Sequence, residues 1–178
     1  MIDNLCNQKK LIILGAGGFG QTVRDLASQT RKYSRSCFLD DHSDANDVIG
    51  KLNDYLKFID GRTEFIVALG NNAMRRQWLE TLAMAKAAIA TLVHVRAYIS
   101  PTAKVENGCI VLPQAVVNTN CALKRGCIVN IGAIVDHGCI LEECVHVAPG
   151  GIVKAENRIP ALMKIESGVV VKNHHYSL

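Results

Sequence analysis

The sequence has few aromatic residues and no long apolar run. Phe, Trp and Tyr make up 5% of its 178 residues, and with 14 glycines this favours a repetitive scaffold over an ordinary packed core. The longest apolar runs, Leu11–Gly18 and Ala87–Val93, are too short to cross a bilayer. The first ten residues are polar and give no sign of a secretory signal, so we expect a cytoplasmic protein with no membrane partner.

Clusters of one charge sign are also missing. The 20 Lys and Arg residues exceed the 16 Asp and Glu residues by four and are scattered along the chain, so nucleic acid is not an expected partner. Seven cysteines in a chain without a secretory signal are expected to be reduced thiols. The length allows two small domains.

Residues 1–95 alternate between strand and helix patterns. The apolar run Lys10–Leu14 leads into a turn with Gly15, Gly17 and Gly20, and helical spacing follows as far as Thr30. Glycines between a strand and a helix let the backbone approach a phosphate at the helix N-terminus. The second strand, Ser36–Leu39, ends in Asp40 and Asp41, where a Rossmann-type acid would meet a ribose hydroxyl.

A third strand, Glu64–Leu69, ends at Gly70, Asn71 and Asn72, which lie at the same strand-end edge as Asp40 and are further candidate substrate contacts. A helix then extends to about Ala88 before a last strand, Ile89–Val93. This Rossmann-like α/β region supplies one mononucleotide-binding half, whereas a dinucleotide such as NAD needs two. The pattern therefore favours a nucleotide or nucleotide-sugar. The alternative is that the glycines serve only tight packing of helix on strand.

Residues 96–178 repeat every six positions. An aliphatic residue occupies each of thirteen consecutive steps from Ile99 to Val171, and a small residue precedes most of them by two positions. Such hexapeptide repetition is typical of an all-β parallel β-helix, in which three short strands form one triangular coil. We expect about four coils. Cys109, Cys121, Cys127 and Cys139 then fill inward positions as small apolar residues, with no metal site among them.

The outward positions of two faces are apolar where solvent is expected. One column holds Val116, Ile134 and Ile152, and another holds Ile110, Ile128 and His146. A ring of three prisms needs two such faces on each copy, so we expect a homotrimer that buries both columns.

Histidines near these columns are candidates for chemistry. Asn130, Asp136, His137 and His146 form one constellation, in which a neutral His137 could act as a general base. Asp136 or Glu143 could orient His137. A Cys144 nucleophile assisted by His146 is a less favoured alternative, and each histidine could simply be a polar corner residue.

The motifs resemble those of a known family. Asn130–His137, His146–Gly150, the Gly15–Gly20 turn, Phe38–Asp41 and Ala68–Asn72 together are similar to the hexapeptide-repeat acetyltransferases of the sialic-acid O-acetyltransferase and UDP-4-amino-sugar N-acetyltransferase family, including the bacillosamine-pathway type.

The resemblance implies a left-handed β-helix, a trimer, and acetyl-CoA bound between neighbouring prisms. It implies that His137 deprotonates the amine of a nucleotide-linked sugar, that Asn130 helps to place the acceptor, and that His146 contacts acetyl-CoA. Gly150 and Gly151, beside His146 in the sequence, are further candidate contacts of acetyl-CoA, and Asp136 remains a candidate catalytic residue. The alternatives are O-acetylation of sialic acid or a related hydroxyl, and a trimer that binds nucleotide-sugar without catalysis.

Overall fold

The computed structural model describes residues 9–177, which divide into two compact units. The polar segment before residue 9, on which the expectation about a secretory signal partly rests, lies outside these residues, as does Cys6. Within the described residues, 9–70 and Gln77–Ala90 form the first unit, whereas Asn71–Arg76 and residues 91–177 form the second. The second unit thus starts at Thr91 rather than at residue 96, and it includes the first turn of a helix that the sequence placed in the first domain.

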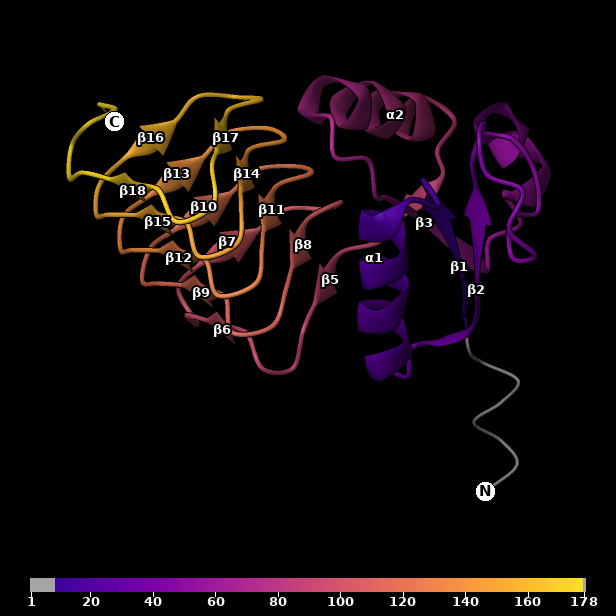
Figure 1. The fold of residues 1–178 in the computed structure, drawn as a ribbon, viewed down its shortest axis with the longest axis horizontal. Coiled ribbons are helices and arrows are strands. Elements are labelled where there is room, and N and C mark those ends of the chain that lie inside the picture. Colours follow the sequence, from indigo (N-terminus) through magenta and orange to yellow (C-terminus); the bar gives the residue numbers. More distant parts are fainter. Residues whose placement is uncertain (1–8, 178) are drawn as a thin grey trace. The chain divides into compact units, whose positions relative to one another are not determined.

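The first unit is built on a parallel sheet with the strand order β2-β1-β3-β4. Its elements in chain order are β1 (Lys9–Leu14), α1 (Gly18–Gln29), β2 (Tyr33–Leu39), the 3-10 helix η1 (Leu52–Phe58), β3 (Thr63–Val67), α2 (Asn72–Met84) and β4 (Ala88–Ile89) (Figure 1). Helix α1 buries Val23, Leu26 and Ala27, an amphipathic spacing that packs one helix side against β1 and β2. The predicted Rossmann-like α/β half is therefore confirmed.

The second unit is a parallel β-helix of two-residue strands, seen as stacked coils in Figure 1. We call its three sheets the first, second and third faces. The first face holds β5 (Leu92–Val93), β8 (Ile110–Val111), β11 (Ile128–Val129), β14 (His146–Val147) and β17 (Lys164–Ile165). The second holds β6 (Tyr98–Ile99), β9 (Val116–Val117), β12 (Ile134–Val135), β15 (Ile152–Val153) and β18 (Val170–Val171). The third holds β7 (Lys104–Val105), β10 (Ala122–Leu123), β13 (Ile140–Leu141) and β16 (Arg158–Ile159).

Five strands on two faces and four on the third form between four and five coils, where about four were expected. One of the extra strands is Leu92–Val93, predicted as the end of an α/β strand, which pairs with β8 and starts the first face. Strands eighteen residues apart pair in register, so the aliphatic positions of the repeat stack inside the coils. Val111, Val129 and Val147 are fully buried there, together with the four cysteines predicted to point inward. All six cysteines of the described chain are free thiols.

From the corner that follows β7 onward, each corner between faces contains one residue with a positive φ. From Gly108 to His174 these angles lie between 51° and 75°. Glycine adopts this conformation without strain, which explains its recurrence at 108, 126, 132, 138 and 150. Residues such as Gln114 and Cys144 take the same conformation in other coils, so glycine alone does not mark every corner.

The prediction that Ile110 and Ile128 bury themselves against another copy is wrong. Both side chains are fully buried within the chain itself. The first turn of α2 hydrogen-bonds to the corners beside this face, through Arg75 to Gly126 and Cys144. The second face, in contrast, keeps an exposed apolar column, in which Tyr98 is 54% and Ile134 36% exposed.

Candidate active site

Asp136 and His137 lie in the corner that follows β12, between the second and third faces. Asp136 Oδ1 accepts the backbone N–H of His137 at 2.7 Å and lies 3.1 Å from His137 Nδ1. These hydrogen bonds from His137 hold the pKa of Asp136 below its usual value, so the carboxylate is charged and the proton on Nδ1 points to it. The lone pair of His137 is then on Nε2, on a ring that is more than half exposed.

Asn118 completes this corner, although the sequence reasoning did not select it. Its Nδ2 donates to Asp136 Oδ1 at 3.1 Å from one coil earlier. The spacing of eighteen residues before Asp136 was the available signal. Glu143, the other acid considered for orienting His137, pairs with Arg125 at 3.1 Å and with Arg76 at 3.7 Å. Of these two acids, Asp136 is the one that contacts His137.

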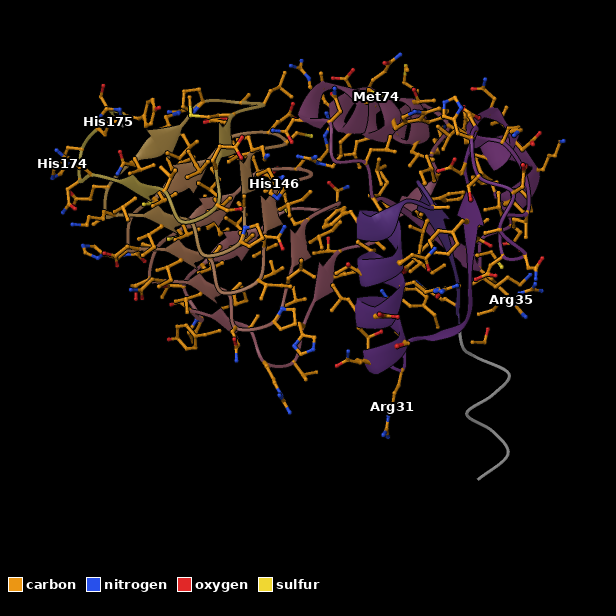
Figure 2. The ribbon with its side chains drawn as sticks, viewed as in Figure 1. Arg31, Arg35, Met74, His146, His174 and His175 are labelled. Carbon is orange, nitrogen blue, oxygen red and sulfur yellow. The ribbon has the colours of Figure 1, made fainter. Side chains whose placement is uncertain are left out.

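Asn130 and His146 form a second, buried pair. His146 lies on β14 in the first face, beside Ile128 of β11 (Figure 2). Asn130 Oδ1 accepts the N–H of Ile131 at 2.8 Å, which directs Nδ2 toward His146 Nε2 at 3.1 Å. An amide N–H donates, so Nε2 is the acceptor and the ring is neutral.

The electrostatic surroundings also keep His146 neutral. Burial lowers the pKa of His146, and the positive charges of Arg75 and Lys164 lower it further, to about 4. Glu166 acts in the opposite direction but does not compensate. His146 is thus an uncharged ring at neutral pH.

The sequence suggested one constellation, but a single chain forms two separate pairs. Asn130 opens the corner that precedes β12, and His137 lies in the corner that follows it. The pairs therefore occupy opposite edges of the second face, with the apolar column between them. Gly150 and Gly151 lie in the corner after β14, where their N–H groups donate to Ile131 and Ala148.

The glycine turn of the first unit divides into packed and open positions. Gly15 has φ of 105°, and a Cβ on Gly20 would lie 2.0 Å from the Gly15 carbonyl oxygen, so both serve the close crossing of α1 and β1. Gly17 is exposed at the N-terminus of α1, and no atom would meet a Cβ there. Of the predicted phosphate contacts, Gly17 has the open surroundings that a ligand needs.

Asp40 and Asp41 hold this region together. Asp40 Oδ2 accepts the N–H of Ala16 at 2.7 Å, and its Oδ1 accepts the N–H groups of His42 and Ser43. Burial acts to raise the pKa of Asp40, but these backbone donors hold it below its usual value. Asp41 Oδ1 accepts the N–H of Leu52 at 3.0 Å. Both carboxylates thus have structural partners within the chain.

The loop at Gly70–Asn72, predicted to contact substrate, is divided between the two units, since Gly70 belongs to the first and Asn71 to the second. Asn71 Oδ1 accepts the N–H of Met74, and Asn72 belongs to the second unit. There its Nδ2 donates to Leu162 O at 2.8 Å and its Oδ1 accepts from Arg75, so its polar atoms already have partners in the chain. Gly70 is exposed and open around a Cβ position.

The Cys144 alternative does not suit the geometry. The side chain is 1% exposed, and burial raises the pKa of its thiol, which opposes formation of a nucleophilic thiolate. Within residues 9–177, no group of three or more His, Cys, Asp or Glu side chains could hold a metal ion. Over the same residues, no helix is both long and apolar enough to span a bilayer.

Residues 10–82 match the family description PglD N-terminal domain. The UDP-N-acetylbacillosamine N-acetyltransferase of Bacillus subtilis (strain 168) is 28% identical over 113 residues, which is 58% of this chain and 51% of that protein. The chain thus spans about half the length of this curated relative.

Two solved structures are also similar. The acetyltransferase domain of PglB from Neisseria gonorrhoeae FA1090, in complex with acetyl coenzyme A, is 35% identical with a TM-score of 0.88, covering 93% of this chain and 82% of that chain. A variant of perosamine N-acetyltransferase from Caulobacter crescentus, in complex with CoA and GDP-perosamine, shares the fold at 19% identity and a TM-score of 0.75, covering 90% and 73%.

These similarities extend over both units, and the β-helix is of the left-handed class found in such acetyltransferases. The chain therefore belongs to the hexapeptide-repeat acetyltransferases of the bacillosamine-pathway type.

Proposed function

We propose that the chain transfers the acetyl group of acetyl-CoA to the amine of a nucleotide-linked amino-sugar, UDP-linked in the first instance. The observation that supports this most is the Asp136–His137 pair, which leaves His137 Nε2 as an exposed proton acceptor. The printed names of the relatives, one acting on a bacillosamine derivative and one bound to acetyl coenzyme A, support the choice of substrates.

In this reaction the amine nitrogen attacks the thioester carbonyl carbon. The new C–N bond forms as the C–S bond breaks, and CoA leaves as the thiolate. His137 Nε2 takes the proton that the amine loses and passes it to the thiolate, so the chain ends unchanged. No acyl-enzyme is needed, because positioning of two bound substrates supplies much of the rate.

Acetyl-CoA is the co-substrate of this proposal. Neutral His146, held by Asn130, presents a buried ring that could contact the thioester or the pantetheine arm, with Gly150 and Gly151 in the adjacent corner. The nucleotide would lie at the open glycine turn of the first unit, near Gly17 and Asp40.

The site also needs a second copy of the chain. His137 and the Asn130–His146 pair lie at opposite edges of the second face, so one copy does not bring them together. The outward apolar column on that face is exposed at Tyr98, Ile134 and Val170 and half-buried at Val116 and Ile152. It is suited to packing against a neighbour in a homotrimer.

A thiol-release assay tests the proposed reaction. CoA release is measured with acetyl-CoA and a panel of UDP-, GDP- and CMP-linked amino-sugars, each beside the matching sugar with a hydroxyl in place of the amine. Release with a nucleotide-linked amine supports the proposal. Release only with a hydroxyl acceptor would identify an O-acetyltransferase, and ligand binding in calorimetry without release would identify a non-catalytic binding protein.

A further inference from the structure

The first turn of α2 contains a fully buried arginine that contacts the β-helix. Arg75 is 0% exposed and belongs to the second unit with the coils. Its Nε donates to Gly126 O at 2.9 Å, and its Nη2 donates to Cys144 O at 2.7 Å and to Asn72 Oδ1 at 2.8 Å. Asn72 Nδ2 in turn donates to Leu162 O at 2.8 Å.

The three acceptor carbonyls occupy equivalent positions in successive coils. Gly126, Cys144 and Leu162 are eighteen residues apart, each with a positive φ, in the corners between the third and first faces. A strand of the first face starts two residues after each of them: β11, β14 and β17. Arg75 and Asn72 therefore link three neighbouring coils at the corner where these strands begin.

The chemistry of the side chain suits this role. Burying a guanidinium is costly unless its N–H groups find acceptors, and the corner carbonyls supply them. The planar fork directs Nε and Nη2 to two carbonyls at once, which the single ammonium of lysine cannot reproduce. The link thus fixes one coil against the next at the base of β11 and β14.

We propose that Arg75 is a positioning residue that fixes Asn130 and His146 relative to each other by tying the corners at Gly126 and Cys144. The effect of Arg75 on catalysis rests on the proposed function, in which His146 contacts acetyl-CoA. The link that Arg75 forms between two coils does not depend on which reaction the protein performs.

The charges around His146 agree with this placement. Arg75 and Lys164 face it as cations and Glu166 as an anion, and His146 lies beside Ile128 of the adjacent strand. The positive charge of Arg75 favours the neutral ring whose Nε2 accepts the Asn130 N–H.

Amide hydrogen exchange in Arg75→Gln tests the link without any substrate. The amides of Ile128 and Asn130 donate across the first face to Val145 and Val147, whereas those of Ile134 and Asp136 donate across the second face. We expect exchange at Ile128 and Asn130 to accelerate about 10-fold or more, with the second face unchanged. Equal acceleration on both faces, or none, would overturn the inference.

The matched control is Arg76→Gln, which changes the next residue, an exposed arginine near Glu143, and should leave both faces unchanged. If the Arg75→Gln protein does not fold, Asn72→Ala keeps Arg75 but removes one acceptor of its guanidinium. Asn72→Ala should also accelerate amide exchange at Ile128 and Asn130, by a smaller factor than Arg75→Gln. If exchange at these amides is not accelerated, the inference is overturned.

Activity provides a separate result. In Arg75→Gln we expect a lower kcat with an unchanged KM for the nucleotide-sugar, and a rise in the pKa of His146 followed by NMR. Localised exchange in a protein that never releases CoA would support the inference and refute the proposed function. A His146 titration identical to that of the parent protein would count against the link.

Discussion

At the scale of single residues, the two histidines differ because their surroundings differ. His137 is exposed and its Nδ1 faces a carboxylate, an arrangement that leaves Nε2 as a base. His146 is buried beside Arg75, with its pKa lowered to about 4, so it remains neutral. We therefore propose His137 for proton transfer and His146 for contact with acetyl-CoA.

Replacing Asp136 with Asn tests the orienting role. The neutral amide accepts hydrogen bonds more weakly than a carboxylate and carries no charge to hold the proton on Nδ1 of His137, so the ring tautomer is no longer fixed. We expect kcat to fall roughly 10-fold with unchanged acetyl-CoA binding. Asn118→Ala removes only the hydrogen bond to Asp136, so its kcat should fall less than that of Asp136→Asn. A larger loss of kcat in Asn118→Ala than in Asp136→Asn would contradict the orienting role of Asp136.

Glu64 gives a pH prediction in the first unit. Burial acts to raise its pKa, but hydrogen bonds from Lys32, Lys9 and Tyr33 lower it to about 2. The unfolded chain therefore takes up this proton at higher pH than the folded chain does. The stabilisation is complete above about pH 4.5 and is lost as the pH falls toward 2.

Thermal unfolding of the parent protein and of Glu64→Gln, measured from pH 2 to 7, checks this. The variant should be less stable at neutral pH by roughly 1–3 kcal/mol. The difference should shrink as the pH is lowered, and a constant difference at every pH would show that the charge of Glu64 is not the cause.

At the scale of elements, the strand–turn–helix unit at β1 and α1 depends on close backbone approach. A Cβ on Gly20 would lie 2.0 Å from Gly15 O, whereas Gly17 is open. The sequence pattern identified both glycines equally, because a motif records where glycine occurs but not which neighbour requires it. The structure separates the glycine needed for packing from the one that leaves room for a ligand.

Gly20→Ala should therefore destabilise the protein by about 1–3 kcal/mol or more, since the helix must move away from the strand. Gly17→Ala is the matched control and should leave the unfolding temperature nearly unchanged, while weakening nucleotide-sugar binding if the backbone approaches phosphate there. Chemical denaturation measures the first effect and calorimetry the second. Equal losses of stability in Gly20→Ala and Gly17→Ala would contradict the distinction between a packed and an open glycine.

The repeat shows what the sequence could and could not predict for the elements. Residues from Ile99 to Val171 predicted stacked coils, because each aliphatic side chain needs the same inward position. Leu92–Val93 was assigned to the wrong unit because a two-residue apolar strand looks alike in both folds. Arg75 was missed because its partners are main-chain carbonyls, which leave no mark in the sequence.

At the scale of the whole molecule, the surface of the β-helix decides whether the site can form. A column of outward side chains is apolar whether it packs against another copy or against other residues of its own chain. The sequence alone therefore does not distinguish an interface between copies from a surface buried within one chain. Ile128 proved to be buried internally, whereas Ile134 and Tyr98 remain exposed on the second face. The second face is thus the surface we expect a neighbouring copy to cover.

Ile134→Glu should disrupt the assembly, because a carboxylate would be buried in an apolar contact. Light scattering should give the mass of a trimer for the parent protein and of a monomer for the variant. The rate of acetyl transfer should fall as the trimer is lost. Leu56→Glu, at a 61% exposed position of η1, is the control and should remain trimeric. If the parent protein is monomeric at micromolar concentration, the proposal that neighbouring copies share the active site is wrong.

The most direct measurement compares CoA release by the parent protein and His137→Ala at saturating acetyl-CoA and nucleotide-linked amino-sugar. We expect kcat to fall about 10²–10⁴-fold while calorimetry shows that both substrates still bind. An unchanged kcat in His137→Ala would contradict the assignment of His137 as the base on which the proposed transfer depends.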